Sequence, residues 1–200
     1  MSNINALCVY CGSSPGTDPA FVAAAQQFGK LLADNRIRLI YGGGSVGLMG
    51  AVAHAALEHG GEVTGIIPEF LTKRERPRRL SQELIVTADM HERKRTMFER
   101  ADGFVALPGG LGTLEEVVEQ LTWAQLGRHK KPILFANISG YWDPLLTLVD
   151  HMRAVKFVPS ALSVDFLVAD QVEDILPKLR KAARDVAEAE QTMAVPAERL

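Results

Sequence analysis

The sequence predicts an α/β fold, a Rossmann-like doubly wound parallel sheet flanked by helices. Short apolar segments typical of buried strands alternate along the chain with segments in which apolar residues recur at helical spacing. Glycine-rich turns follow two of the predicted strands, and a length of 200 residues suits one α/β domain. We expect residues 1–187 to form this single domain and residues 188–200 a frayed C-terminal tail, since the tail alternates alanine with polar residues.

The composition excludes several classes of protein. Hydrophobic residues make up 47% of the chain and charged residues 23%, which is typical of a soluble globular protein and not of a disordered or fibrous one. The formal net charge of −2 gives no basic excess for nucleic acid or an anionic membrane, so neither is expected as a partner. Residues 1–5 lack a signal-peptide pattern and no run of eighteen apolar residues occurs, which favours a cytoplasmic location.

Four strands are expected in the first half of the chain, at residues 6–10, 37–41, 62–67 and 83–87. Asp18 and Pro19 are typical of the N-cap and first position of a helix, and apolar residues at helical spacing follow them. Further helices are expected over 51–59 and 89–98. Between them, residues 69–80 carry five basic side chains. We expect a solvated loop or a flap over a neighbouring pocket there, and the alternative is a patch that binds phosphate or RNA.

The second half continues the alternation. Strands are predicted at residues 102–107, 132–136 and 165–168. One helix is predicted directly after the strand at 102–107, and two more over residues 142–155 and 171–187. Because strands and helices alternate, we expect a parallel sheet joined by right-handed crossovers.

The stretch Pro108–Glu116 is a turn from a predicted strand into a helix and the strongest candidate for a site. Its three glycines let the backbone approach a ligand, and the first N–H groups of the helix carry the positive end of the helix dipole, which suits a phosphate. Thr113 and Glu116 also match a capping box, which requires no ligand. Capping does not explain three glycines and two adjacent acids, so we favour a site in which Thr113 has capping as a second role.

A second glycine-rich turn, Gly42–Gly50, follows the predicted strand at 37–41. Its spacing resembles a dinucleotide-binding fingerprint, but no acidic residue ends a strand about twenty residues further on, as ribose binding requires. Both turns would lie at the carboxyl ends of parallel strands, where open α/β sheets bind ligands. We therefore expect Gly43 and Gly44 to contribute to a shared ligand site.

Charged residues near these turns suggest the chemistry. Arg93 and Lys94 begin a predicted helix at the same edge of the sheet, where an arginine binds phosphate bidentately and a lysine acts as a point charge. Beside a phosphate, the carboxylates of Glu115 and Glu116 suit cleavage of an N-glycosidic bond, in which an oxocarbenium-like ribose develops and a water is activated. Glu116 is the first choice for this role, because the helix N-terminus and Arg93 would hold it ionised. The sequence assigns no residue to leaving-group protonation.

Cys8 and Cys11 form a CxxC spacing that elsewhere marks a redox pair or half of a zinc site. Here they lie in a strand that runs into a loop, and no second cysteine pair occurs, so we expect neither role. The five histidines show no recognised ligand spacing, and neither a metal nor a cofactor is expected.

Four motifs together closely resemble those of the Lonely Guy (LOG) family: Gly42–Gly50, Asp89–Lys94, Leu107–Glu116 and Thr122–Gly127. The resemblance implies a Rossmann-like, homodimeric cytokinin riboside 5′-monophosphate phosphoribohydrolase, with a nucleotide-binding catalytic domain. Its substrate would be a purine riboside monophosphate, N6-substituted or plain AMP, cleaved to the free base and ribose 5-phosphate. By the same resemblance the catalytic residues are Arg93 and Glu116. The implied nucleotide-binding positions are Lys94, Gly109, Gly110, Gly112, Thr113, Glu115 and Thr122.

Three other functions compete with this one. Members of the family are often labelled lysine decarboxylases, but that reaction uses pyridoxal phosphate on a lysine Schiff base, for which nothing else in the sequence argues. Molybdenum cofactor carrier proteins are similar and use the same glycine turns to hold a phosphorylated pterin. A nucleotide sensor that binds AMP without turnover is the third, since only hydrolysis needs Glu116. The combination of Arg93 with Glu116 favours the enzyme.

Overall fold

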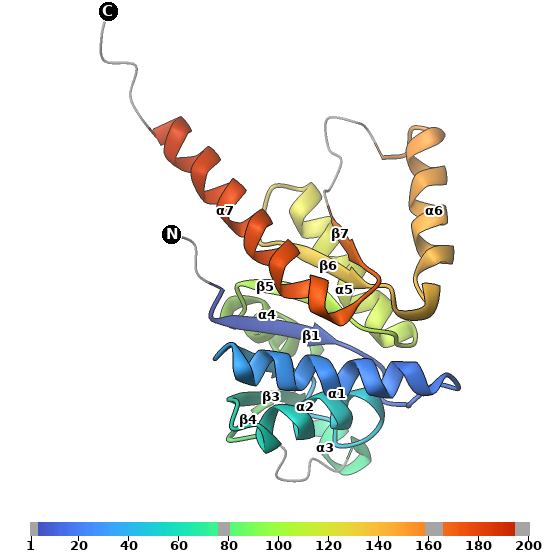
Figure 1. Ribbon diagram of the computed structural model, residues 1–200, viewed down its shortest axis with the longest axis vertical. Coiled ribbons are helices and arrows are strands. Elements are labelled where there is room, and N and C mark those ends of the chain that lie inside the picture. The colour runs from blue at the N-terminus through green and yellow to red at the C-terminus, as the bar shows by residue number, and fades with distance from the viewer. Residues whose placement is uncertain (1–3, 76–80, 159–165, 195–200) are drawn as a thin grey trace, which may run out of the picture.

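The computed structural model describes residues 4–75, 81–158 and 166–194, and within them one parallel sheet organises the chain (Figure 1). Its seven strands lie in the order β4-β3-β2-β1-β5-β6-β7. The strands are β1 (Ala6–Tyr10), β2 (Arg38–Tyr41), β3 (Val63–Pro68), β4 (Glu83–Thr87), β5 (Gly103–Ala106), β6 (Ile133–Ala136) and β7 (Leu167–Ala169). The predicted α/β fold is confirmed, and each predicted strand is present with small shifts at its ends.

Helices follow the strands in alternation. They are α1 (Pro19–Asp34), α2 (Gly47–Glu58), α3 (Glu69–Glu75), α4 (Met90–Arg100), α5 (Leu111–Gln125), α6 (Asp143–Ala154) and α7 (Ile175–Ala194). Short 3-10 turns, η1 (Ile138–Gly140) and η3 (Val172–Asp174), precede α6 and α7. Asp18 caps α1 as predicted, since its carboxylate accepts a hydrogen bond from the N–H group of Ala20 at 2.8 Å.

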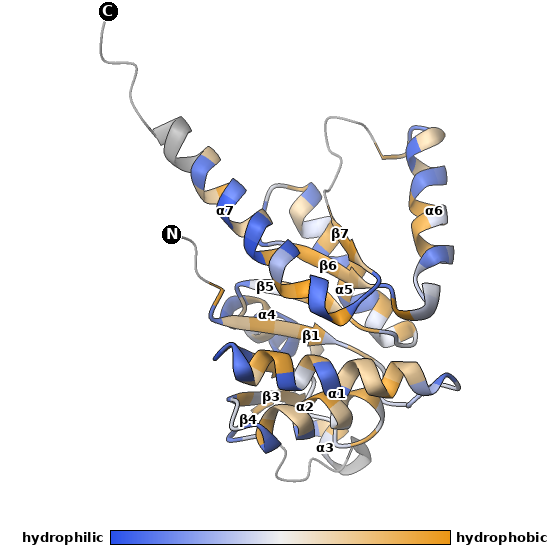
Figure 2. Ribbon diagram, viewed as in Figure 1, coloured by the Kyte–Doolittle hydropathy of each residue, from blue (hydrophilic) through white to orange (hydrophobic). Residues whose placement is uncertain are grey.

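Both faces of the sheet are buried, because alternate residues of a strand point to opposite faces. In β1, Leu7 and Val9 pack into a core with α1, α2 and α7, whereas Cys8 and Tyr10 pack into a second core with α4 and α5. Figure 2 accordingly shows the central strands in the colours of apolar residues. This double burial explains why the strands appear in the sequence as continuous apolar runs.

The strand order fixes where a ligand can bind. From β1 the chain adds strands outward to β4, and it then returns to place β5 on the other side of β1. The loops that leave β1 and β5 therefore diverge to opposite faces of the sheet. Such a switch point, at the carboxyl ends of the strands, is where open α/β sheets bind ligands.

The segment expected to be a loop over residues 69–80 is partly helical. Residues 69–75 form helix α3, with Glu69 in its first turn, where an acidic side chain stabilises the helix dipole. The remaining residues of that segment, 76–80, lie outside the described part of the chain.

Two further helices extend beyond their expected bounds. Helix α2 begins at Gly47, before the expected start at Ala51, so the second glycine turn includes the first turn of the helix. Helix α7 continues to Ala194, past the expected end at Ala187, because its alanine and glutamate residues are strong helix formers. Within the described ranges no helix, α7 included, combines the length and apolar character that a membrane span requires.

Helices α1 and α2 pack at close range because Gly29 has no side chain. A Cβ atom at Gly29 would lie 2.3 Å from the carbonyl oxygen of Val52 and 3.0 Å from the Cβ of Ala55. Neither atom is the end of a flexible side chain, so neither can turn aside. Gly29 therefore sets the distance between the two helices and, with it, the place of the turn that precedes α2.

We expect Gly29→Ala to lower the free energy of unfolding by about 1–3 kcal/mol, the usual effect of overpacking, although alanine is otherwise the better helix former. Gly112→Ala in helix α5 is the matched control, since nothing lies within 4 Å of a Cβ at that position. Urea unfolding followed by circular dichroism measures both variants. Equal stability of the two would contradict the role of Gly29.

Candidate functional site

Three loops meet at the switch point of the sheet, and the backbone of Gly12 joins them. The N–H group of Gly12 donates to the carbonyl of Pro108 and its carbonyl accepts from the N–H group of Leu48, both at 3.0 Å. Gly47 has a φ of +61°, and a Cβ there would lie 2.3 Å from the carbonyl carbon of Ser13. The loops after β1, β2 and β5 therefore form one unit, and the two glycine turns lie side by side as predicted.

The start of α5 differs from the predicted capping box. The helix begins at Leu111, its N-cap is Gly110 in an extended conformation, and no side chain bonds to the cap. Thr113 is thus inside the first turn, where its buried Oγ1 lies 2.1 Å from the place that a Cβ of Gly109 would occupy. The capping role predicted for Thr113 is wrong, because Gly110 supplies the extended residue. The first N–H groups of α5 are left for an anion.

Arg93 of α4 is buried beside these turns, with 6% of its surface exposed. Its Nε donates to the carbonyl of Ile66 at 3.1 Å, and its Nη2 donates to the carbonyl of Gly42 at 3.2 Å. A Cβ at Gly42 would lie 2.2 Å from this Nη2, so the first glycine of the second turn makes room for the guanidinium. Because Nε and Nη2 serve the main chain, Arg93 has fewer donors for a phosphate than the sequence suggested.

The other side of the guanidinium faces Glu116 of α5. The Nη1 of Arg93 lies 3.5 Å from the Oε1 of Glu116, and the two side chains are 7% and 12% exposed. A positive charge at this distance in a buried place stabilises the ionised carboxylate. The structure thus brings together the two residues that the sequence selected for catalysis.

Lys94 forms a separate group on the same pair of helices. Its Nζ lies 2.5 Å from the Oε1 of Glu115 and 2.9 Å from the Oε1 of Glu119. Burial opposes the charge of Lys94, but the hydrogen bonds that its ammonium donates to the two carboxylates outweigh burial and raise the pKa of the amine. The ammonium predicted to meet a phosphate is therefore held between two carboxylates.

An apolar groove of about 540 Å³ separates α5 from α6. Glu115 and Thr122 line it, together with leucine, valine and methionine side chains. Thr122 donates to the carbonyl of Val118 at 2.8 Å. Since a helix rises 1.5 Å per residue, Thr122 lies roughly 17 Å along the axis from Leu111. The predicted binding residues of α5 therefore fall into two groups, one at the helix N-terminus and one in the groove.

The two glycines of the second turn that are predicted to contact a ligand differ in exposure from those of the first turn. Gly43 and Gly44 are buried, whereas Gly110 and Gly112 are exposed. Gly43 has a φ of +78°, and a Cβ there would lie 3.2 Å from the Cβ of Ile67. Backbone conformation and packing account for Gly43 without a ligand, and the contact of Gly43 and Gly44 with a ligand stays a prediction.

Sequence reasoning missed Glu119, which pairs with Lys94, and Tyr141. Tyr141, in the loop after β6, donates from its hydroxyl to the carbonyl of Gly109. The available signal was its place after a predicted strand, at the same edge of the sheet as the glycine turns.

Cys8 and Cys11 are buried free thiols. Burial is the main cause that raises the pKa of each thiol far above its usual range, and the charge of Glu116 adds to the effect. No group of three or more histidine, cysteine, aspartate or glutamate side chains among the described residues is placed to hold a metal ion. The geometry gives neither thiol the low pKa that redox or metal chemistry needs.

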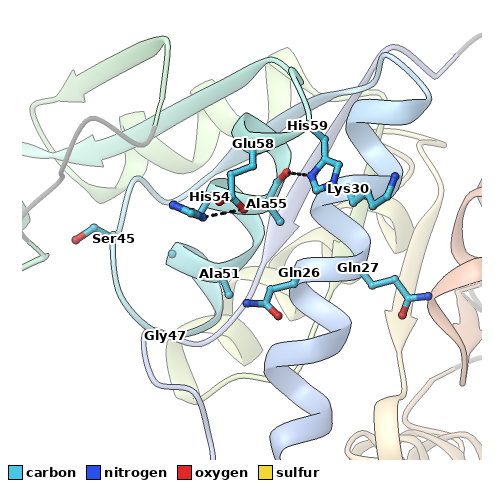
Figure 3. A pocket seen from close by; sticks show the side chains of 11 residues that line it. Gln26, Gln27, Lys30, Ser45, Gly47, Ala51, His54, Ala55, Glu58 and His59 are labelled. Atoms are coloured by element: carbon cyan, nitrogen blue, oxygen red, sulfur yellow. Dashed lines mark hydrogen bonds and ion pairs between the residues drawn. The ribbon is translucent and has the colours of Figure 1, made fainter.

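A second hollow, of about 760 Å³, lies between α1 and α2 (Figure 3). His54 pairs with Glu58 at 3.1 Å, and the Nδ1 of His59 lies 2.9 Å from the carbonyl oxygen of Ala55. These polar side chains find partners within α2, and we assign the hollow no part in the site.

The fold and the site define a Rossmann-like protein in which glycine-rich turns meet a buried arginine–glutamate pair. A family model described as "possible lysine decarboxylase" matches residues 49–179. The chain is 50% identical over 180 residues to the cytokinin riboside 5′-monophosphate phosphoribohydrolase LOG7 of Arabidopsis thaliana. The matched region covers 90% of this chain and 83% of that protein. The chain is also 42% identical over 180 residues to the cytokinin riboside 5′-monophosphate phosphoribohydrolase LOG of Oryza sativa subsp. japonica, and the match covers 90% of this chain and 74% of that protein. The chain therefore belongs to the LOG family, as its motifs indicated.

Solved structures of more distant proteins share the fold. The molybdenum cofactor binding protein of Rippkaea orientalis matches with a TM-score of 0.68 and 22% identity, covering 90% of this chain and 98% of that one. The Moco carrier protein of Chlamydomonas reinhardtii matches with a TM-score of 0.68 and 21% identity, covering 92% and 99%. At this identity the likeness concerns the fold alone.

The raised pKa values of the two thiols give a test of how tightly Cys8 and Cys11 are packed beneath the site. At pH 8 we expect Cys8 and Cys11 to be protonated and unreactive toward DTNB in the folded protein. Both thiols should react once urea unfolds the chain, and that sample is the control. Absorbance of the released thiolate counts the reacting groups. Rapid reaction of either thiol in the folded protein would show that β1 or the loop after it is more accessible than the structure indicates.

Proposed function

We propose that this protein hydrolyses the N-glycosidic bond of purine riboside 5′-monophosphates. The substrates would be N6-substituted adenosine monophosphates or AMP, and the products the free base, a cytokinin or adenine, and ribose 5-phosphate. The observation that carries the proposal is the buried pair of Arg93 and Glu116, 3.5 Å apart, beside a helix N-terminus suited to a phosphate. Relatives at 41–50% identity are named for this activity, which supports the same assignment.

The geometry suggests how the reaction proceeds. The N–H groups at the start of α5 bind the 5′-phosphate, which places the ribose over the next turn, where Glu116 lies. As the bond between C1′ and the base nitrogen lengthens, positive charge develops on the ribose and the carboxylate of Glu116 stabilises it. A water attacks C1′, its oxygen forms the new bond and it releases one proton to solvent. The electron pair of the broken bond leaves with the base, which takes up one proton, so that the net reaction is the addition of one water.

Arg93 acts mainly through Glu116 in this scheme. Its guanidinium keeps a negative charge at a site with little solvent, and its bonds to the carbonyls of Gly42 and Ile66 fix its position. Glu116 therefore serves to stabilise a cation or orient water, not to donate a proton.

The apolar groove between α5 and α6 suits the base and an N6 substituent. Glu115 and Thr122, which the family resemblance assigns to nucleotide binding, both line the groove. Its other side chains are mostly aliphatic, which matches an unsaturated hydrocarbon substituent better than a charged one.

The alternative functions receive less support from the site. The lysine decarboxylase reaction needs a neutral amine for a Schiff base, and Lys94 is held charged by Glu115 and Glu119. A carrier or a sensor needs the phosphate site but has no use for a buried arginine–glutamate pair. The likeness to the molybdenum cofactor proteins concerns the fold. A carrier function is the alternative that we would favour if turnover is absent.

The first test is the role of Glu116. We expect Glu116→Gln, which keeps the shape of the side chain, to abolish release of the base while AMP binding changes by less than about tenfold, or roughly 1.4 kcal/mol. Chromatography of AMP and isopentenyladenosine monophosphate digests measures turnover, and calorimetry measures binding. Glu99→Gln, at an exposed position of α4, is the matched control. Normal turnover by Glu116→Gln would remove this residue from the mechanism.

We also propose a homodimer formed through α5 and α6. Exposed apolar side chains cluster on and near these two helices, and an exposed apolar patch of this kind is typical of an interface. They are Val118, Leu126, Leu148, Met152, Val155 and Phe157. A second copy seated on this face would also cover the groove and exclude water from the base.

We expect Leu148→Asp to convert the dimer into a monomer, because a carboxylate would be buried without a partner in the interface. Val86→Asp on the edge strand β4 is the control, since Val86 is 54% exposed and Leu148 47%. Light scattering coupled to size-exclusion chromatography gives the mass of each. A monomeric wild-type protein, or a dimeric Leu148→Asp variant, would contradict this interface.

A further inference from the structure

Tyr141 lies outside the LOG motifs but touches the phosphate-binding turn. Its hydroxyl donates to the carbonyl of Gly109. Its ring meets Phe21 of α1 edge to face at 5.4 Å between centroids and Trp142 at 5.0 Å. Two neighbours therefore hold the ring, and the hydroxyl has a fixed direction toward the turn.

The bond to Gly109 determines how the next peptide group is oriented. A trans peptide is planar, so the carbonyl of Gly109 and the N–H group of Gly110 point in opposite directions. While Tyr141 holds the carbonyl of Gly109 on its own side, the N–H group of Gly110 points away from Tyr141. Gly110 is the N-cap residue of α5, so this N–H group directly precedes those of the first turn of the helix. The turn gains one more donor for an anion.

This peptide would not hold its orientation by itself. Both of its residues are glycines, which occupy many backbone conformations, and Gly110 is exposed with nothing within 4 Å of a Cβ. The preceding peptide is fixed differently, because the carbonyl of Pro108 accepts from the N–H group of Gly12 at 3.0 Å. A flip of the peptide after Gly109 would turn a carbonyl oxygen toward the phosphate, where the two negative groups repel.

We propose that Tyr141 is a positioning residue of the phosphate site. Its hydroxyl fixes the carbonyl of Gly109 so that the N–H group of Gly110 faces the 5′-phosphate of the substrate. This inference rests on the proposed function for the identity of the ligand. It assigns to Tyr141 an effect on phosphate binding and none on the base or on the chemical step.

Tyr141→Phe removes the hydroxyl and keeps the ring between Phe21 and Trp142. We expect the dissociation constant for AMP to rise about 5- to 10-fold, as expected for loss of one charge-assisted hydrogen bond, while the constant for adenosine stays unchanged. In turnover, KM for AMP should rise by the same factor and kcat should stay within about twofold, because the phosphate is bound alike in the ground and transition states.

The matched control is Thr147→Val, which removes a hydroxyl that donates to the carbonyl of Asp143 on α6. This variant should keep wild-type constants for AMP and adenosine. Tyr141→Leu, which also removes the ring, should lower the melting temperature, whereas Tyr141→Phe should not. These two variants separate loss of packing from loss of the hydroxyl.

Two results with the Tyr141→Phe variant would overturn the role of Tyr141. One is wild-type AMP affinity in Tyr141→Phe, and the other is an equal loss of affinity for AMP and adenosine, which would indicate a general disturbance. A wild-type protein that binds AMP but does not cleave it would overturn the proposed function and leave the comparison of the variants intact. A wild-type protein that binds neither AMP nor ribose 5-phosphate would overturn both.

Discussion

The site depends on a charge that is buried away from water. A guanidinium with 6% exposure is unfavourable unless every side of it has a partner, and Arg93 obtains its partners from three other elements. The carbonyl of Gly42 comes from the residue after β2, the carbonyl of Ile66 from within β3, and the carboxylate of Glu116 from α5. One side chain of α4 thereby links two neighbouring strands and a helix.

Much of the fold could be predicted because its signals are local. Runs of apolar residues mark the strands, since a parallel sheet covered on both faces needs no polar alternation. Asp18 and Pro19 mark the start of α1 through interactions that span a few residues. The meeting of Arg93 with Glu116 could also be predicted, because both residues follow a strand and the carboxyl ends of parallel strands share one edge of the sheet.

The remaining features depend on contacts between distant segments. The sequence selects Gly43 and Gly44 as ligand contacts, yet it is Gly42 that makes room for Arg93, which lies 51 residues further along the chain. Thr113 matches a cap in sequence, but Gly110 already ends the extended segment and leaves Thr113 beneath Gly109. Such assignments require the path of the backbone, which the spacing of residues does not provide.

In the proposed function, helix α5 would separate phosphate binding from the chemical step along its length. Its N-terminus would hold the phosphate through the main chain, which any sequence with suitable glycines can supply. In the proposed reaction Glu116, one turn further, would supply the charge, and the groove that reaches Thr122 would determine which base is bound. A protein can therefore keep the fold and the phosphate site and lose hydrolysis by changing one side chain. For this reason the function of a protein cannot be inferred from a fold that it shares with others at 22% identity, whereas the pair of Arg93 and Glu116 argues for a specific reaction.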